Sequence, residues 1–119
     1  MKKLKRFGFF DSVSLEQRKA QLVQLIGENE HAQKASVLRY LRGGEQLMLV
    51  AGIVRDPLDP NRPIIGSPHI LTDGTWAWSA DVTYYVEKYN LRLPEEFLES
   101  MKANGWRVPK VADIRLLEF

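Results

Sequence analysis

The fold of this chain is decided by residues 69–78, which read HILTDGTWAW. Two short runs of strand-forming residues flank Asp73 and Gly74, and an Asp-Gly pair favours a two-residue hairpin turn because both turn positions need a positive φ. The register that follows from this turn places Leu71 opposite Trp76. Side chains alternate across a strand, so the hairpin has two different faces. One face would carry His69, Leu71, Trp76 and Trp78, and the other Ile70, Thr72, Thr75 and Ala77.

An uncharged apolar run occupies residues 47–54, LMLVAGIV. A continuous apolar run between turn signals is typical of a strand buried on both faces, so we place it in the centre of the sheet. Gly52 would mark a bulge or a tight contact within that strand. Three prolines in residues 55–63 predict a loop, and residues 64–65 are expected to form a short edge strand.

Two helices are predicted before the hairpin. Ser14 and Gln17 have the spacing of a capping box, which would begin a first helix over residues 14–26. Asn29 suits the N-terminal cap of a second helix over residues 30–41. The link between the two helices would then be very short, and a short link predicts a helical hairpin.

Two further helices are predicted after the hairpin. Ser79 would cap a third helix over residues 80–89, and Pro94 would open a fourth at its first turn. The aliphatic residues near the end of the chain favour a short final strand over residues 114–117.

The composition fits one globular domain over residues 1–119, because 45% of the residues are hydrophobic and 27% are charged. Helices and strands in the predicted order indicate an α+β fold, in which helices pack on one face of a small antiparallel sheet. The chain has no cysteine, which excludes a disulfide framework, a thiolate metal site and a thiol nucleophile.

The net charge of +2 arises from the first residues. Four of the 17 basic side chains lie in residues 2–6, and the remaining 13 face 15 acidic ones, so the body carries a charge of −2 (13 − 15). These four are Lys2, Lys3, Lys5 and Arg6. We expect residues 1–10 to be a solvated, flexible basic segment. No apolar run reaches the roughly 18 residues that cross a bilayer, and we identify no export signal.

Motifs for chemistry are missing from the sequence. The two histidines, His31 and His69, are 38 positions apart and no metal-ligand spacing surrounds either of them. Phosphate-binding glycine patterns and a G-x-S-x-G elbow are also absent. We therefore predict no catalytic, cofactor-binding or metal-binding residue. A diffuse enzyme site around His69, Asp73 and Tyr84 is kept as an alternative.

Five Trp and Tyr side chains fall within residues 76–89. Packing in the core explains Trp76 and Tyr85, whereas Trp78 and Tyr84 are better candidates for the surface. Tyrosine and tryptophan are preferred anchors of protein interfaces, and acidic residues beside them would suit a basic protein partner. The predicted partner-binding residues are Asp73, Trp78, Asp81, Tyr84, Glu95 and Glu96.

Three motifs in the same region carry a family resemblance. They are D-G-x-W-x-W at residues 73–78, Y-Y-V-x-x-Y at residues 84–89 and L-P-x-x-F at residues 93–97. With these motifs the chain resembles small bacterial immunity-type proteins of contact-dependent growth inhibition and related polymorphic-toxin systems. The resemblance implies a cytoplasmic, non-enzymatic protein without a cofactor. Its partner would be the C-terminal domain of a cognate toxin, a nuclease whose active site it blocks, and not nucleic acid or a membrane.

A nucleic-acid-binding accessory protein is the competing interpretation. It would use the basic residues 2–6 together with Trp78, because basic side chains contact phosphates and aromatic rings stack on bases. Nuclease inhibitors are often strongly acidic, and the near-neutral body of this chain departs from that pattern.

Overall fold

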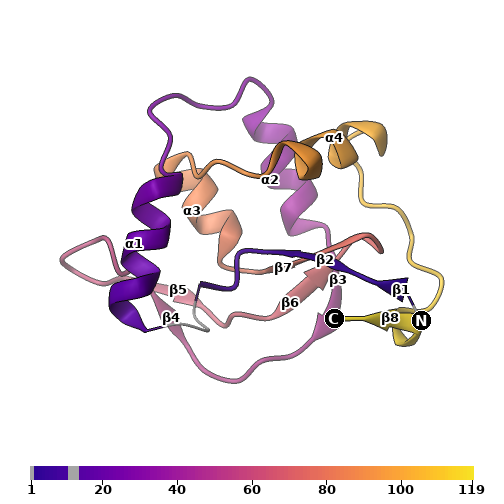
Figure 1. Cartoon of the computed structure of the whole chain (residues 1–119), viewed down its shortest axis with the longest axis horizontal. Coiled ribbons are helices and arrows are strands. Elements are labelled where there is room, and N and C mark those ends of the chain that lie inside the picture. Colours follow the sequence, from indigo (N-terminus) through magenta and orange to yellow (C-terminus); the bar gives the residue numbers. More distant parts are fainter. Residues whose placement is uncertain (1, 11–13) are drawn as a thin grey trace.

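The computed structural model describes residues 2–10 and 14–119 and has the α+β fold that the sequence predicts (Figure 1). The helices are α1 (Leu15–Leu25), α2 (Lys34–Arg42), α3 (Val82–Tyr89) and α4 (Glu95–Ala103), with a 3-10 turn η2 (Ile114–Leu116). The strands are β1 (Lys2–Lys3), β2 (Lys5–Phe7), β3 (Glu45–Met48), β4 (Val54–Arg55), β5 (Ile64–Gly66), β6 (Ile70–Thr72), β7 (Trp76–Ser79) and β8 (Leu117–Glu118).

The main sheet has four strands in the order β2-β7-β6-β3. Strands β3, β6 and β7 are antiparallel, but β2 runs parallel to β7, so the sheet is mixed and not purely antiparallel. Two small pairs flank it, β1 with β8 in parallel and β4 with β5 in antiparallel orientation. Pairing with β7 makes the basic N-terminal segment part of the fold.

The prediction of a flexible basic tail is wrong for residues 2–10, and Met1 lies outside the described residues. Leu4, between β1 and β2, and Phe10, just after β2, are buried in the two apolar clusters of the domain, which holds both strands in place. The charge pattern alone did not reveal the strands, because few apolar residues lie among the four basic ones.

The two faces of the hairpin pack as the alternation predicts. Trp76 and Trp78 belong to the larger core, whose other members come mainly from the four helices. Ile70 and Ala77 point to the opposite face and form a smaller cluster with Leu4, covered by apolar side chains near both chain ends. Figure 1 shows the helices gathered on one side of the sheet, as expected.

The hairpin turn begins one residue later than predicted. Leu71 pairs with Trp78, and the amide of Asp73 donates to the carbonyl of Trp76 (3.3 Å), so the reversal centres on Gly74 and Thr75. Only Gly74 has a positive φ (92°), which fits a turn with glycine first. The register differs from the prediction by two residues, and an even shift leaves the faces unchanged.

The prediction of a central buried strand over residues 47–54 is wrong. Strand β3 ends at Met48 and lies at the edge of the sheet, and its neighbour β6 has only three residues with which to pair. Leu49 and Ile53 are 71% and 67% exposed. Gly52 has a φ of 110° in this segment, and a Cβ placed there would contact nothing within 4 Å, so no tight contact explains it.

The first helix is confirmed and the second is shorter than predicted. In α1 the Gln17 amide donates to Ser14 Oγ (3.2 Å) and the Ser14 amide donates to Gln17 Oε1 (3.3 Å), which is the expected capping box. Helix α2 begins only at Lys34, so Asn29 does not cap it and the predicted short helical hairpin is wrong. Lys34 Nζ donates to Asn90 Oδ1 (2.7 Å), a contact that holds the start of α2 against the end of α3.

The last third of the chain follows the prediction closely. Helix α3 begins at Val82 with Asp81 as its cap, two residues after the predicted cap Ser79. Asn90 ends it in the left-handed conformation (φ 53°), and α4 begins directly after Pro94. The final strand β8 begins at Leu117 and not at residue 114 as predicted, because η2 takes up residues 114–116.

Candidate functional site

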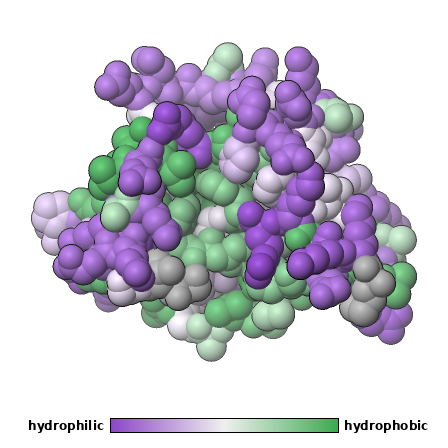
Figure 2. Space-filling model, in the orientation of Figure 1, coloured by the Kyte–Doolittle hydropathy of each residue, from purple (hydrophilic) through white to green (hydrophobic). Residues whose placement is uncertain are grey.

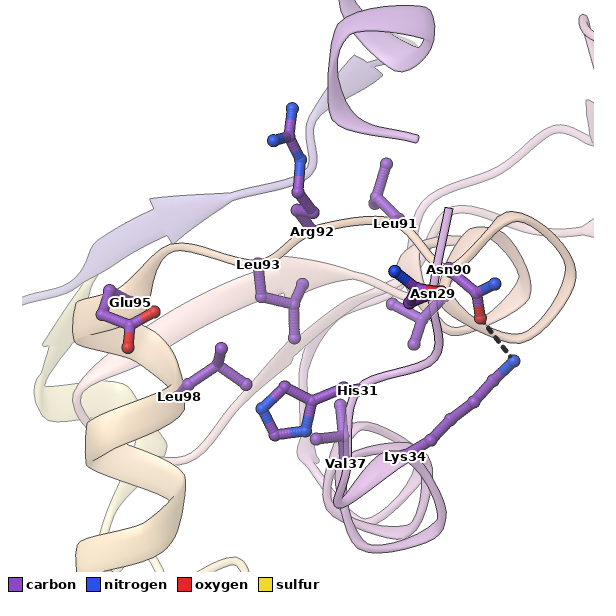
Figure 3. A pocket seen from close by; sticks show the side chains of 11 residues that line it. Asn29, His31, Lys34, Val37, Asn90, Leu91, Arg92, Leu93, Glu95 and Leu98 are labelled. Carbon is purple, nitrogen blue, oxygen red and sulfur yellow. Dashed lines mark hydrogen bonds between the residues drawn. The ribbon is translucent and has the colours of Figure 1, made fainter. Parts of the chain in front are cut away.

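A pocket of about 240 Å³ opens between α2, α3, α4 and the two links that join these helices to their neighbours (Figure 3). Its apolar floor consists of Val37, Val86, Leu91, Leu93 and Leu98. Val37 and Val86 belong to helices whose other apolar side chains fill the core, so the floor continues the main core outward. The polar lining comes from Asn29, His31, Lys34, Asn90, Arg92 and Glu95.

Two of the three basic groups around the pocket are already engaged. Lys34 Nζ donates to Asn90 Oδ1 and to the carbonyl of Glu87 (3.0 Å) and also pairs with Glu30. The Arg92 guanidinium donates to the carbonyl of Gln24 and points away from the pocket in Figure 3. These contacts fix Lys34 in the pocket wall and hold the Arg92 guanidinium outside the pocket.

His31 and Glu95 are two of the polar side chains that keep free atoms at the pocket. The Gln33 amide donates to His31 Nδ1 (3.0 Å), so a neutral ring carries its proton on Nε2. Figure 3 shows the imidazole ring reaching across the floor toward Leu98. The Glu95 carboxylate makes no hydrogen bond with any other residue in the described part of the chain, and it lies at the exposed start of α4.

The size and lining of the pocket suit one apolar side chain of another protein. Pockets for drug-sized ligands usually measure about 300–1,000 Å³, which is larger than this one. Interfaces commonly place one buried apolar or aromatic anchor in such a pocket and surround it with polar groups. The arrangement can therefore hold an apolar anchor on the floor and a hydrogen-bonding group at His31 or Glu95.

The structure separates the six predicted contact residues. Glu95 lies at the pocket, and Glu96 is exposed and pairs with Lys5 of β2. Tyr84 is half-buried on α3, where its hydroxyl donates to Asp56 (2.8 Å). Among the described residues no contact joins Tyr84 to the two glutamates.

The other three predicted contact residues are buried. Trp78 has no exposed surface, so the prediction of an exposed Trp78 is wrong: its ring fills the core and its Nε1 donates to the carbonyl of Leu41 (3.1 Å). Asp73 accepts the amides of Thr75 (2.8 Å) and Trp76 (2.7 Å) in the hairpin turn. Asp81 is buried beside Ser79, whose hydroxyl donates to it.

Asp73 also links the hairpin to the helices. The hydroxyl of Tyr40 in α2 donates to Asp73 Oδ2 (2.6 Å) and accepts from the side-chain amide of Asn104 (2.9 Å), which follows α4. Burial and the Asp73 carboxylate raise the pKa of the Tyr40 phenol well above its ordinary value, so the hydroxyl stays protonated. This network holds the ends of α2 and α4 to the turn.

A second network, around Asp56, was not found by sequence reasoning. Asp56 is fully buried and accepts from the hydroxyls of Tyr89 (2.6 Å) and Tyr84 (2.8 Å) and from Lys88 Nζ (3.2 Å). Burial alone would raise the pKa of the Asp56 carboxyl, but these hydrogen bonds outweigh burial and hold that pKa below its ordinary value. Burial and the Asp56 carboxylate in turn raise the pKa of Tyr89 to about 12.

The Asp56 network fastens the proline-rich loop to α3. The Leu58 amide donates to Asp56 Oδ1 (2.9 Å), and Lys88 Nζ also reaches Asp59 Oδ2 (2.7 Å) in the same loop. The spacing of Tyr84 and Lys88, four residues apart on one helix face, was the available signal. The predicted loop and the edge strand β5 are confirmed, and β5 pairs with β4 across it.

The residues of the alternative enzyme site do not converge. His69 Nδ1 accepts from the amide of Val50 (2.9 Å), Asp73 is bound in the hairpin turn, and Tyr84 contacts Asp56. Over residues 2–10 and 14–119 no group of three or more carboxylate or histidine side chains is arranged to hold a metal ion. None of the helices in the same ranges has the length and apolar character needed to cross a bilayer.

No family model, curated protein or solved structure matches this chain.

Proposed function

We propose that this chain is an immunity-type protein that binds a cognate toxin domain in the cytoplasm, a nuclease, and neutralises it by covering its active site. The observation that carries the proposal is the pocket between α2, α3 and α4. It has an apolar floor, and beside the floor lie His31 Nε2 and the Glu95 carboxylate, which can bond to a partner. An apolar side chain of the toxin occupies the floor. Glu95 faces basic groups of the toxin, since nucleases bind a polyanionic substrate through basic residues.

The burial and hydrogen bonding of Asp56, Asp73 and Asp81 support a binding role over catalysis. Asp56, Asp73 and Asp81 are buried and accept hydrogen bonds that hold loops, turns and helix starts in place. A general acid or base needs a carboxyl within reach of a substrate. Of the six contact residues predicted from the sequence, Glu95, Glu96 and the half-buried Tyr84 retain exposed surface for a partner.

Replacement of Leu98 by arginine is expected to weaken toxin binding about 30-fold or more. The change places a charged chain over the apolar floor, and loss of a central anchor typically costs about 2 kcal/mol or more. Calorimetric titration against the toxin domain measures the dissociation constant. Leu116→Arg is the matched control, because Leu116 is exposed and lies outside the pocket lining.

Thermal unfolding of each variant shows whether it keeps its fold. If Leu98→Arg unfolds, the milder Leu98→Ala takes its place, with a smaller loss of affinity expected. Equal affinities for a folded pocket variant and the Leu116→Arg control would disprove a role for the pocket.

A nucleic-acid-binding accessory protein is the second candidate, and the N-terminal strands favour it. Lys2, Lys3 and Arg6 are exposed on β1 and β2, so their charges lie on a folded surface and not on a tail. Lys2 and Lys110 also line one shallow depression beside the hairpin turn. Such a surface suits phosphate contacts.

Binding of single-stranded DNA under this second candidate should weaken steeply as salt is raised. For single strands, each phosphate that a basic side chain neutralises contributes about 0.7 to the slope of log affinity against log salt, so Lys3→Ala should flatten the slope by about that amount. Fluorescence anisotropy with a labelled oligonucleotide provides the measurement. No binding at low salt would eliminate this candidate.

A further inference from the structure

Another pocket, of about 380 Å³, lies where the end of α2 meets the segment that follows α4. Figure 2 shows mostly hydrophilic residues along the upper border of the molecule, where α4 and the start of α2 lie in Figure 1. The volume falls within the range of about 300–1,000 Å³ that is usual for small-molecule sites. The lining consists of Arg39, Tyr40, Gly43, Trp106, Arg107 and Val108, and none of these residues lines the pocket assigned to the toxin.

Two arginines bring positive charge to this pocket. Arg39 comes from α2 and Arg107 from the segment after α4, and both side chains are exposed. Within residues 2–10 and 14–119, neither guanidinium donates a hydrogen bond or pairs with a carboxylate, whereas the neighbouring Arg42 pairs with Glu87. The six lining residues include no acidic one, so the two arginines leave the pocket positively charged.

Trp106 brings an aromatic ring to the same pocket. The side chain is half-buried and packs in part against the main core. Its amide donates to the carbonyl of Met101 (3.0 Å) at the end of α4, and its φ of 61° lies in the left-handed region. Glycine or asparagine adopts this backbone at lower cost than a bulky residue, and strained residues of this kind cluster at binding sites. The backbone therefore does not explain a tryptophan at this position.

The floor of the pocket is held in a fixed position. Tyr40 is buried, and its hydroxyl donates to Asp73 Oδ2 (2.6 Å) and accepts from the side-chain amide of Asn104 (2.9 Å). These two bonds hold α2 and the end of α4 together beneath Trp106 and the arginines. A ligand would therefore meet a preformed site, which reduces the ordering cost of binding.

We propose that this pocket binds a nucleotide, whose base stacks on Trp106 and whose phosphate binds Arg39 and Arg107. A guanidinium group matches phosphate oxygens with paired hydrogen bonds, and the face of an indole ring stacks on any base. The nucleotide is either free or one unit of a single strand, because both offer the same base and phosphate. The site uses none of the residues of the toxin pocket, so nucleotide binding and toxin binding can each fail without the other.

Titration with adenosine monophosphate, followed by tryptophan fluorescence and by calorimetry, tests the proposal. Trp76 and Trp78 are 6% and 0% exposed, so Trp106 is the one of the three tryptophans that a ligand in solution can reach. Adenosine monophosphate should quench the fluorescence saturably. Adenosine and inorganic phosphate should each bind about tenfold more weakly or worse, since each lacks one of the two contacts. Absence of saturable quenching, or inorganic phosphate that binds as tightly as the nucleotide, would overturn the proposal.

Substitutions of the exposed arginines separate the pocket from the general charge of the surface. Arg39→Gln and Arg107→Gln should each weaken binding of adenosine monophosphate about tenfold or more, because each removes a charged hydrogen-bond donor. Arg42→Gln is the matched control, since it removes the same charge from the same helix outside the pocket lining, and it should bind as the unmodified chain does. Equal losses in Arg39→Gln and Arg42→Gln would overturn the assignment to this pocket.

A short single-stranded oligonucleotide distinguishes the two sources of the nucleotide. A strand that displaces adenosine monophosphate and binds more tightly would identify one unit of a nucleic acid as the ligand, and a strand that does not displace it would identify a free nucleotide. Lys3→Ala should leave the affinity for adenosine monophosphate unchanged, because Lys3 does not line this pocket. That variant therefore separates this site from the basic surface of β1 and β2.

Discussion

Replacing Asp56 with alanine is expected to lower the free energy of unfolding by about 3–5 kcal/mol. The carboxylate is fully buried and binds Tyr84, Tyr89 and Lys88 of α3, so its removal leaves two partly buried hydroxyls and a cation without their shared acceptor. The loop over residues 56–63 would also lose its Asp56 contacts to α3 and would keep the contact between Lys88 and Asp59. Urea unfolding monitored by circular dichroism measures the loss.

Asp59→Ala is the matched control for this network. Asp59 also accepts from Lys88 Nζ, but it is partly exposed, so water can take the place of its carboxylate and the loss of stability should be much smaller. Equal effects of the two substitutions would contradict the central position that we assign to Asp56.

The same carboxylate should make stability depend on acid pH. Because the folded pKa of Asp56 lies below its ordinary value, the unfolded chain binds the proton more tightly. The stabilisation is present above the unfolded pKa of about 4 and is lost as pH falls through the folded value. Unfolding free energies measured from pH 6 downward should fall less steeply for Asp56→Asn than for the unmodified chain, and parallel curves would refute this assignment.

Replacing Trp78 with alanine should cost about 3–5 kcal/mol, a loss that would leave little of a typical domain's stability. The ring is completely buried between the hairpin and the helices, with Phe97 at 5.4 Å and Tyr40 at 6.1 Å between ring centroids. Its removal opens a cavity at the point where α2, α4 and the sheet meet. The midpoint and slope of urea unfolding give the change.

Trp78→Phe separates the packing of the ring from its hydrogen bond. Phenylalanine keeps most of the buried apolar surface but leaves the Leu41 carbonyl without the donor that Nε1 supplies. An unsatisfied buried acceptor costs about 1–3 kcal/mol, so the loss should be clearly smaller than for alanine. A tolerated Trp78→Ala would contradict the buried position and support the exposed one that the sequence suggested.

Local sequence signals predicted most helices and the hairpin of this fold. They did not predict the features that depend on pairing between distant strands. The capping box of α1 and the start of α4 at Pro94 depend on neighbouring residues, and both are confirmed. The apolar run over residues 47–54 reads as a buried strand, but a strand is central only if partners pair on both sides, and sequence pattern does not contain that information. The same limit hid β2, whose partner lies about 70 residues away.

The candidate site was predicted only in part. Glu95 was singled out for its charge, but the pocket beside it needs α2 to begin late, which leaves residues 26–33 free to carry Asn29 and His31 to its edge. Trp78 was wrongly predicted to be exposed, because tryptophan and tyrosine are common both at interfaces and in buried cores. Alternation across the strand, which placed Trp76 and Trp78 on one face, was the better guide to burial.

The proposal of toxin neutralisation is tested most directly by titrating this chain into a nuclease assay of the C-terminal toxin domain encoded beside its gene. The account predicts stoichiometric inhibition by the unmodified chain and by Leu116→Arg, and a requirement for about 30-fold or more Leu98→Arg to reach the same inhibition. Full nuclease activity at excess unmodified chain, or an inhibition curve that Leu98→Arg leaves unshifted, would contradict it.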